Sequence, residues 1–237
     1  MEWFSKAVPV LGLILVGVGC GDSDEESGPS TRYYEGAESK ALGAAGNQAD
    51  CATCHANDDS KGRAGATLKD IAYHTSFKGG GADTLLEATN ACVVGWMGGT
   101  ALTASDARWT ELEAYIQSIS DPMITTPNTI APEVLADVAA YESAYAGGDA
   151  AAGQAKYTQY CSNCHSSGRV VGPANSPTLA QLAAESVGRI AQQVRTSGPP
   201  PSGTADATDT TPGPMPFFEP SDLSVADLKD IIAYIKG

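Results

Sequence analysis

The stretches Cys51-Ala-Thr-Cys54-His55 and Cys161-Ser-Asn-Cys164-His165 decide the fold of this chain. In each stretch two residues separate a pair of thiols, and a histidine directly follows the second thiol. This arrangement suits covalent attachment of a haem, because the two sulfurs can add across the two vinyl groups while the adjacent imidazole reaches the iron. We therefore expect two covalently bound haem c groups, one at Cys51 and Cys54 and one at Cys161 and Cys164, with His55 and His165 as axial ligands of the two irons.

Other uses of paired cysteines fit this sequence less well. A disulfide framework suits a short secreted chain, but it does not explain a histidine after each pair. A zinc site needs further cysteines or histidines at finger spacing, and His74 is the remaining histidine of the 3 in the chain. A thioredoxin-like pair explains neither the histidines nor the duplication. Of the 6 cysteines, Cys20 and Cys92 lie outside the two motifs.

The composition limits the size of the domains and the kind of partner. A chain of 237 residues is long enough for two small domains or one of moderate size, and aromatic residues make up only 7% of it. A porphyrin in each domain would supply the apolar body that such a core lacks. With Lys+Arg 14 against Asp+Glu 28 the net charge is −14, which disfavours nucleic acid and anionic membrane surfaces as partners. The charge favours a redox partner protein with a positive docking face, although acidity can also serve solubility alone.

The amino terminus has the pattern of an export signal. Residues 1–20 combine Lys6 with a short apolar run over residues 7–19, and they resemble a bacterial lipoprotein signal in which Cys20 becomes the lipidated first residue. Residues 21–37 are acidic and rich in Ser and Gly, as expected for a flexible tether. We expect the folded part on the periplasmic side of the cell envelope, attached to the membrane through a lipid on Cys20. Ordinary cleavage nearby and an uncleaved anchor are the alternatives.

The second half of the chain has a clear helical pattern around its motif. Residues 150–160 predict a helix, on which Gly153, Tyr157 and Cys161 share one face. A second helix is expected around residues 186–196. The chain closes with a capping pattern at Ser224 and Asp227, followed by a helix whose apolar stripe is Leu228, Ile231, Ile232 and Ile235.

The first half repeats this order with differences. A weak helix is expected before Cys51, and a second helix over residues 84–92. Leu102-Thr103-Ala104-Ser105-Asp106 repeats the capping pattern of the second half. The predicted closing helix then carries the apolar residues Trp109, Leu112, Tyr115, Ile116 and Ile119.

Residues 121–147 separate the two copies. Their first part is rich in Pro and Thr, and Pro132 is a suitable first residue for a helix that runs to Tyr145 and stops at Gly147-Gly148. This helix could pack the two domains together or act as a spacer, and the sequence leaves both possibilities open.

Residues 38–120 and 148–237 each resemble the small class I cytochrome c domain. The resemblance depends on the haem motif after one helix, a methionine on a late loop and a closing helix. It implies an all-α fold of two tandem domains, each a few helices wrapped around a haem with His on one side of the iron and Met on the other. It also implies that the carbonyl of Pro173, in a Gly-Pro pair after the second motif, accepts a hydrogen bond from the ring of His165 and tunes that ligand.

The sixth ligands follow from the same resemblance. Met215, in a proline-rich turn, is the expected ligand of the second haem, and Met97 holds the corresponding place in the first half. A neutral thioether favours ferrous iron and raises the potential. Cys92 is the alternative sixth ligand of the first haem, because a thiolate there would lower the potential, as in the dihaem thiosulfate dehydrogenases that this pairing resembles. His74 can also ligate iron, but a surface histidine is the simpler expectation.

The sequence is compatible with two functions. The first is electron transfer between redox partners, by an exported dihaem carrier or cytochrome subunit with His/Met ligation and no bond-making side chain. The second is an oxidoreductase of a small sulfur compound, with Cys92 at the first haem. A dihaem peroxidase fits less well, since it needs a ligand that is open or readily displaced.

Overall fold

The computed structural model describes most of the chain after the predicted signal. The predicted lipidation site Cys20, the export signal and the first part of the tether lie outside the described residues, which are 28–60, 63, 65–165, 170–171, 174–196, 215 and 217–237. The described chain is helical, with one short antiparallel pair of two-residue strands, β1 (Val170–Val171) and β2 (Ala174–Asn175). The predicted all-α fold class is therefore confirmed. Within these residues no helix combines the length and the apolar character needed to cross a bilayer.

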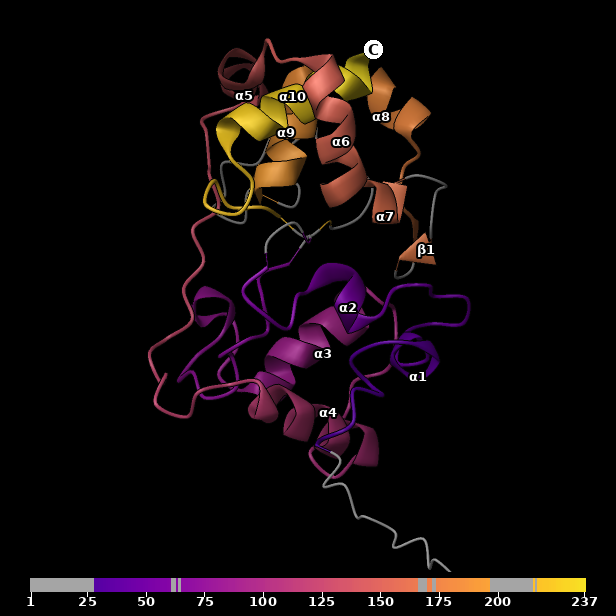
Figure 1. Ribbon diagram of the computed structural model, residues 1–237, viewed down its shortest axis with the longest axis vertical. Coiled ribbons are helices and arrows are strands. Elements are labelled where there is room, and N and C mark those ends of the chain that lie inside the picture. The colour runs from indigo at the N-terminus through magenta and orange to yellow at the C-terminus, as the bar shows by residue number, and fades with distance from the viewer. Residues whose placement is uncertain are drawn as a thin grey trace, which may run out of the picture.

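The helices form two lobes, and a segment running along one side joins them (Figure 1). The first lobe contains the first haem motif, and the second lobe contains the second motif together with the closing helix of the chain. The first lobe comprises α1 (Ala37–Lys40), α2 (Cys51–Cys54), the 3-10 turn η1 (Lys78–Gly80), α3 (Leu85–Gly95) and α4 (Ala107–Ser118). The second comprises α5 (Val138–Tyr145), α6 (Ala150–Tyr160), α7 (Ser162–His165), α8 (Leu179–Ala184), α9 (Val187–Thr196) and α10 (Val225–Lys236).

Each lobe has its own hydrophobic core. The first core packs α4 against α3 and the segment before the motif, and its buried residues are Tyr34, Leu42, Val93, Met97, Leu102, Trp109, Leu112, Tyr115 and Ile116. The second core packs α5, α6, α9 and α10 together, and its buried residues are Tyr141, Tyr145, Tyr157, Ile190, Ala191, Val194, Phe218, Leu223, Leu228, Ile231, Ile232 and Ile235. The predicted stripe of the last helix is thus buried, as amphipathic patterning requires.

The crossing of α6 and α10 holds the second lobe together. Gly153 lies at the crossing, where a Cβ would overlap the backbone carbonyl of Asp230. One turn later, the ring of Tyr157 packs on Tyr234 with centroids 5.3 Å apart. The sequence correctly predicts α6, and the next position on this face is Cys161, the first thiol of the motif. The crossing therefore fixes where the second motif begins.

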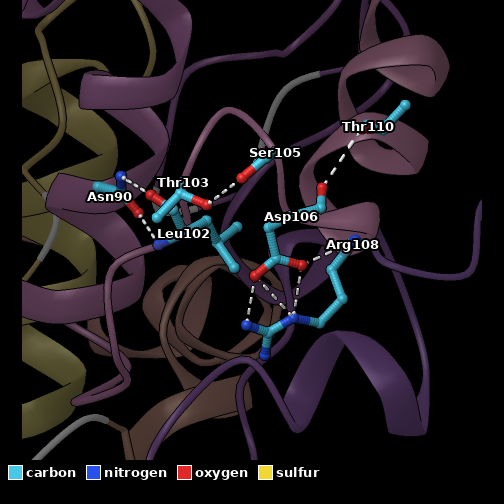
Figure 2. Close-up of polar contacts among 7 residues, drawn as sticks. All are labelled: Asn90, Leu102, Thr103, Ser105, Asp106, Arg108 and Thr110. Atoms are coloured by element: carbon cyan, nitrogen blue, oxygen red, sulfur yellow. Dashed lines mark hydrogen bonds and ion pairs between the residues drawn. The ribbon is translucent and has the colours of Figure 1, made fainter.

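The closing helix of the first lobe does not repeat the cap of the second. In α10 the hydroxyl of Ser224 accepts from the amide of Asp227, as predicted. In α4 the cap is Asp106 itself, whose carboxylate accepts from the amide of Arg108 at 2.9 Å and from its guanidinium at 2.6 Å (Figure 2). By analogy with Ser224, the repeat predicts a cap at Thr103, but the carboxylate of Asp106 bonds Arg108 and caps the helix itself. The helix therefore starts three residues later than the repeat predicts.

Two further predictions need correction. The helix predicted from Pro132 begins only at Val138, where the side chain of Asp137 accepts from the amide of Ala140 and caps it. It packs in the second core and is not a spacer. The weak helix expected before Cys51 is the single turn α1, because the chain then turns around the buried side chain of Asn47, which bonds the backbone of residues 40 and 49.

Candidate functional site

The first motif is a single helical turn held by its own cap. The carboxylate of Asp50 accepts from the amide of Thr53 at 2.8 Å and from its hydroxyl at 2.6 Å, and the Thr53 hydroxyl in turn accepts from the Asp50 amide. This capping box forces Cys51 and Cys54 into one turn of α2, as a short helix without other support requires. The amide of Cys51 also donates to the hydroxyl of the buried Ser39. The spacing of the two thiols is thus set by local hydrogen bonds.

His55 is oriented by a backbone carbonyl. Its Nδ1 lies 2.7 Å from the carbonyl oxygen of Ala66. Because a carbonyl can only accept, Nδ1 carries the proton and Nε2 presents its lone pair, the form in which imidazole binds a metal. Gly65 allows this approach, since a Cβ there would overlap the imidazole ring, and its amide donates to the carbonyl of Cys54 at 2.6 Å.

The second motif is built in the same way. Nδ1 of His165 lies 2.7 Å from the carbonyl oxygen of Pro177, and the hydroxyl of Ser176 donates to the carbonyl of Cys164. Ser176-Pro177 therefore corresponds to Gly65-Ala66 of the first lobe. The expected acceptor, Pro173, lies outside the described residues, and the carbonyl that the ring meets belongs to the proline four positions later. The carbonyl that the His165 ring meets therefore comes from Pro177, after β2, and the prediction for Pro173 stays a prediction.

A cavity of about 340 Å³ opens over the first motif. The thiols of Cys51 and Cys54 and the ring of His55 line it, and so do Cys92 and Met97. Most of the remaining lining is apolar and includes Leu68, Ile71, Leu85, Leu112 and Ile116. An apolar chamber bearing two thiols, an oriented imidazole and a thioether fits a covalently attached haem.

The structure brings both candidate sixth ligands to this cavity. Met97 is buried just after α3, where its carbonyl accepts from the amide of Ala44 at 2.8 Å and its amide donates to the carbonyl of Cys92 at 3.0 Å. Burial raises the pKa of the Cys92 thiol, and the ammonium of Lys78 acts in the opposite direction. Lys78 lines the same cavity and lies over the ring of Trp96, 4.6 Å from its centroid. Met97 and Cys92 therefore both stay candidates for the sixth position.

Of the other predicted ligands, Met215 packs partly buried against the second core. His74 does not line the cavity, because its ring turns to the carbonyl of Thr126 in the connecting segment. His74 is half-buried and bonded to the connecting segment, and so it is not the freely exposed surface histidine that the sequence predicts.

The motif thiols are not arranged for thiol–disulfide chemistry. Burial raises the pKa of Cys51 to about 11 and that of Cys161 to about 12. Reactive pairs of the thioredoxin type need a lowered pKa and a stable thiolate. The pKa of Cys54 is also raised by burial, and the nearby thiol of Cys164 raises it further. The two motifs thus approach each other where α2 of one lobe faces α7 of the other (Figure 1).

Several buried polar atoms in the second lobe lack a hydrogen-bond partner among the described residues. They are the hydroxyl of Tyr157, the side-chain amide of Gln193 and Nη2 of Arg195. Buried polar atoms are normally satisfied, so each of these atoms calls for a partner that the described residues do not supply. A haem with its two carboxylates fits this requirement.

Comparison with known proteins supports the same conclusion for the second lobe. Residues 148–235 match the family model described as cytochrome c oxidase, cbb3-type, subunit III. This segment is a cytochrome c domain. The match to this family implies covalently bound haem c in this segment.

The other comparisons do not identify a family for the rest of the chain. No curated protein sequence matches the chain. Among solved structures, thiosulfate dehydrogenase from Marichromatium purpuratum in its as-isolated form aligns over 81% of this chain and 40% of its own, with 17% sequence identity and a TM-score of 0.37. The chain therefore spans less than half the length of that protein.

Some residues of the site escape prediction from the sequence. The cavity is also lined by residues 128–130 of the connecting segment and by Phe217, Glu219, Ser221 and Asp222 of the second lobe. Asn128 reaches the cavity because its backbone and side chain bind η1, with its side-chain oxygen 3.2 Å from the amide of Lys78. No local pattern marks these residues, since their role depends on how the two lobes pack.

Proposed function

We propose that the protein is an exported dihaem cytochrome c that transfers electrons between redox partners. Each haem is held by two thioether bonds, at Cys51 and Cys54 and at Cys161 and Cys164, with His55 and His165 on one side of the iron. Met97 and Met215 complete the two ligand sets. A lipid on Cys20 attaches the chain to the periplasmic side of the membrane, and the partner presents a positive face to the acidic surface.

The observation that carries this proposal is the repeated construction of the two histidines. His55 and His165 each hold their ring proton against a backbone carbonyl at 2.7 Å, so Nε2 of each ring presents its lone pair, and two half-buried cysteines precede each histidine in its motif. One of the two lies in a segment that is a cytochrome c domain. When bound, the haem supplies a one-electron couple at its iron, and the chain's residues hold and orient it and keep water away.

The approach of the two motifs supports exchange of electrons within the molecule. The thiols of Cys54 and Cys164 influence each other, and residues of the second lobe line the cavity of the first. Two haems attached at these thiols would have neighbouring edges. An electron that enters at either lobe could therefore pass to the other without a second protein.

A second candidate function is oxidation of a small anionic sulfur compound at the first haem. The observation in its favour is that Cys92 and the cation Lys78 line the same cavity as His55. A thiolate ligand would lower the potential of that iron, and a lysine could hold an anion. In this case the second haem would pass the electrons on.

One set of measurements on the mature protein tests both candidates. Mass spectrometry should show two haem groups, and the oxidised protein should show the far-red methionine–iron band at an intensity for two haems. Met97→Ala should halve this band and Cys92→Ala should leave it unchanged. A colourless protein would exclude both functions. Half intensity in the wild type, together with thiosulfate-driven reduction that Cys92→Ala abolishes, would favour the oxidoreductase.

A further inference from the structure

Arg195 is a buried cation in the core of the second lobe. It lies on α9, its side chain is 0% exposed, and its Nε donates to the hydroxyl of Tyr145 at 2.8 Å. Nη1 donates to the carbonyl of Phe218 at 3.1 Å, and a carboxylate oxygen of Glu133 lies 3.4 Å from Nε. Nη2 has no partner among the described residues. A fully buried guanidinium with one unused donor group is costly unless a further acceptor is bound there.

The surroundings of Arg195 place that unused group near the second haem motif. Phe218, which accepts from Nη1, follows the ligand Met215 by three residues. The ring of Phe218 packs edge-on against Tyr160, 5.9 Å between centroids, and Tyr160 directly precedes Cys161. Arg195 therefore lies beside both the segment that carries one iron ligand and the helix that carries the first thiol.

We propose that Nη2 of Arg195 donates a hydrogen bond to a propionate of the second haem and positions that carboxylate. This proposal rests on the proposed function, because it requires a haem at the second motif. A guanidinium matches the planar carboxylate better than other cations do, and it remains charged in a buried site.

The charges around this contact set the direction of its effect on the iron. The positive charge of Arg195 destabilises ferric haem relative to ferrous haem. The negative charge of Glu133 partly offsets the charge of Arg195. Loss of the guanidinium should therefore favour ferric iron and lower the potential, whereas loss of the Glu133 charge should raise it. A role in packing alone gives no such pair of opposite shifts.

The test is a spectroelectrochemical titration of the intact dihaem protein. Arg195→Met should lower the potential of one haem and Glu133→Gln should raise it, each changing the ferric-to-ferrous ratio at fixed potential by about tenfold, or about 59 mV for one electron. The haem whose potential changes should be the same haem whose potential Met215→His changes. Arg189→Met removes the same charge from a half-buried position on the same helix and should change neither haem potential.

Resonance Raman spectroscopy tests the contact itself. The propionate bending band should shift in Arg195→Met and in Arg195→Lys, because lysine keeps the charge but lacks the directed Nη2 donor, and it should not shift in Arg189→Met. If Arg195→Met fails to fold, Arg195→Lys and Glu133→Gln carry the test. Unchanged potentials in Glu133→Gln, or an unshifted band in Arg195→Lys, would overturn the proposal. A wild-type protein without haem at the second motif would instead overturn the proposed function.

Discussion

At the scale of single residues, Gly153 shows how the absence of a side chain can set the position of a whole motif. Replacing glycine by alanine inside a helix ordinarily stabilises it by about 0.5–1 kcal/mol. At Gly153 the added methyl group would overlap the carbonyl of Asp230, so α6 and α10 would have to separate. We expect Gly153→Ala to lower the free energy of unfolding by about 1–3 kcal/mol, as overpacking does.

Denaturant unfolding of the holoprotein measures this change. The control is Gln154→Ala, on the exposed face of α6, which should change the free energy of unfolding by at most about 0.5 kcal/mol. A Gly153→Ala protein as stable as the wild type would show that the helices do not cross closely there.

At the scale of secondary structure elements, the sequence predicts well where a cap and an apolar stripe agree. Helix α10 begins where its predicted cap indicates, because Ser224 accepts from the amide of Asp227, and α6 begins at the predicted residue 150, where the structure adds a cap at Asp149. Pro132 fails as a helix start, since a proline permits a helix but does not require one, and Asp137 supplies the cap that the chain uses.

The same reasoning explains which site residues could be predicted. The haem motifs are contiguous and need no tertiary information. In contrast, the carbonyls of Ala66 and Pro177 reach their histidines across turns without a regular pattern. Arg195 looks like an ordinary helix residue in the sequence, and only the packing of α5 and α9 shows that it is buried.

The pairing of α6 with α10 also carries stability that depends on pH. Lys156 lies 2.5 Å from a carboxylate oxygen of Asp227 and 2.7 Å from one of Asp230. Its ammonium lowers the pKa of both carboxyl groups below their ordinary value of 3.8. The stability from these pairs is therefore present above pH 3.8 and is lost as the pH falls through the lowered values.

Substitution of Lys156 should remove this acid-sensitive part. We expect Lys156→Met to unfold at a lower temperature than the wild type near neutral pH and to converge with it in acid, below the lowered pKa values, where both carboxylates are protonated. Thermal unfolding across this range measures the difference. Lys229→Met removes the same charge from α10 and serves as the control. A deficit in Lys156→Met that stays constant with pH would show that the lysine acts through packing and not through these ion pairs.

At the scale of the whole molecule, the charge of the chain should govern how fast electrons enter and leave. The net charge is −14, and the cavity of the first lobe is lined by the carboxylates of Asp50, Glu219 and Asp222 as well as by Lys78. Salt shortens the reach of these charges from about 30 Å at 0.01 M to about 8 Å at 0.15 M. Added salt should therefore slow reduction by the cation hexaammineruthenium(II) and speed reoxidation by the anion ferricyanide, as stopped-flow measurements can show.

Asp222→Asn should weaken both salt dependences more than Glu113→Gln, which removes an equal charge from α4, away from the cavity. Equal effects of the two substitutions would mean that the total charge, and not the carboxylates at the cavity, directs small redox molecules to the haem.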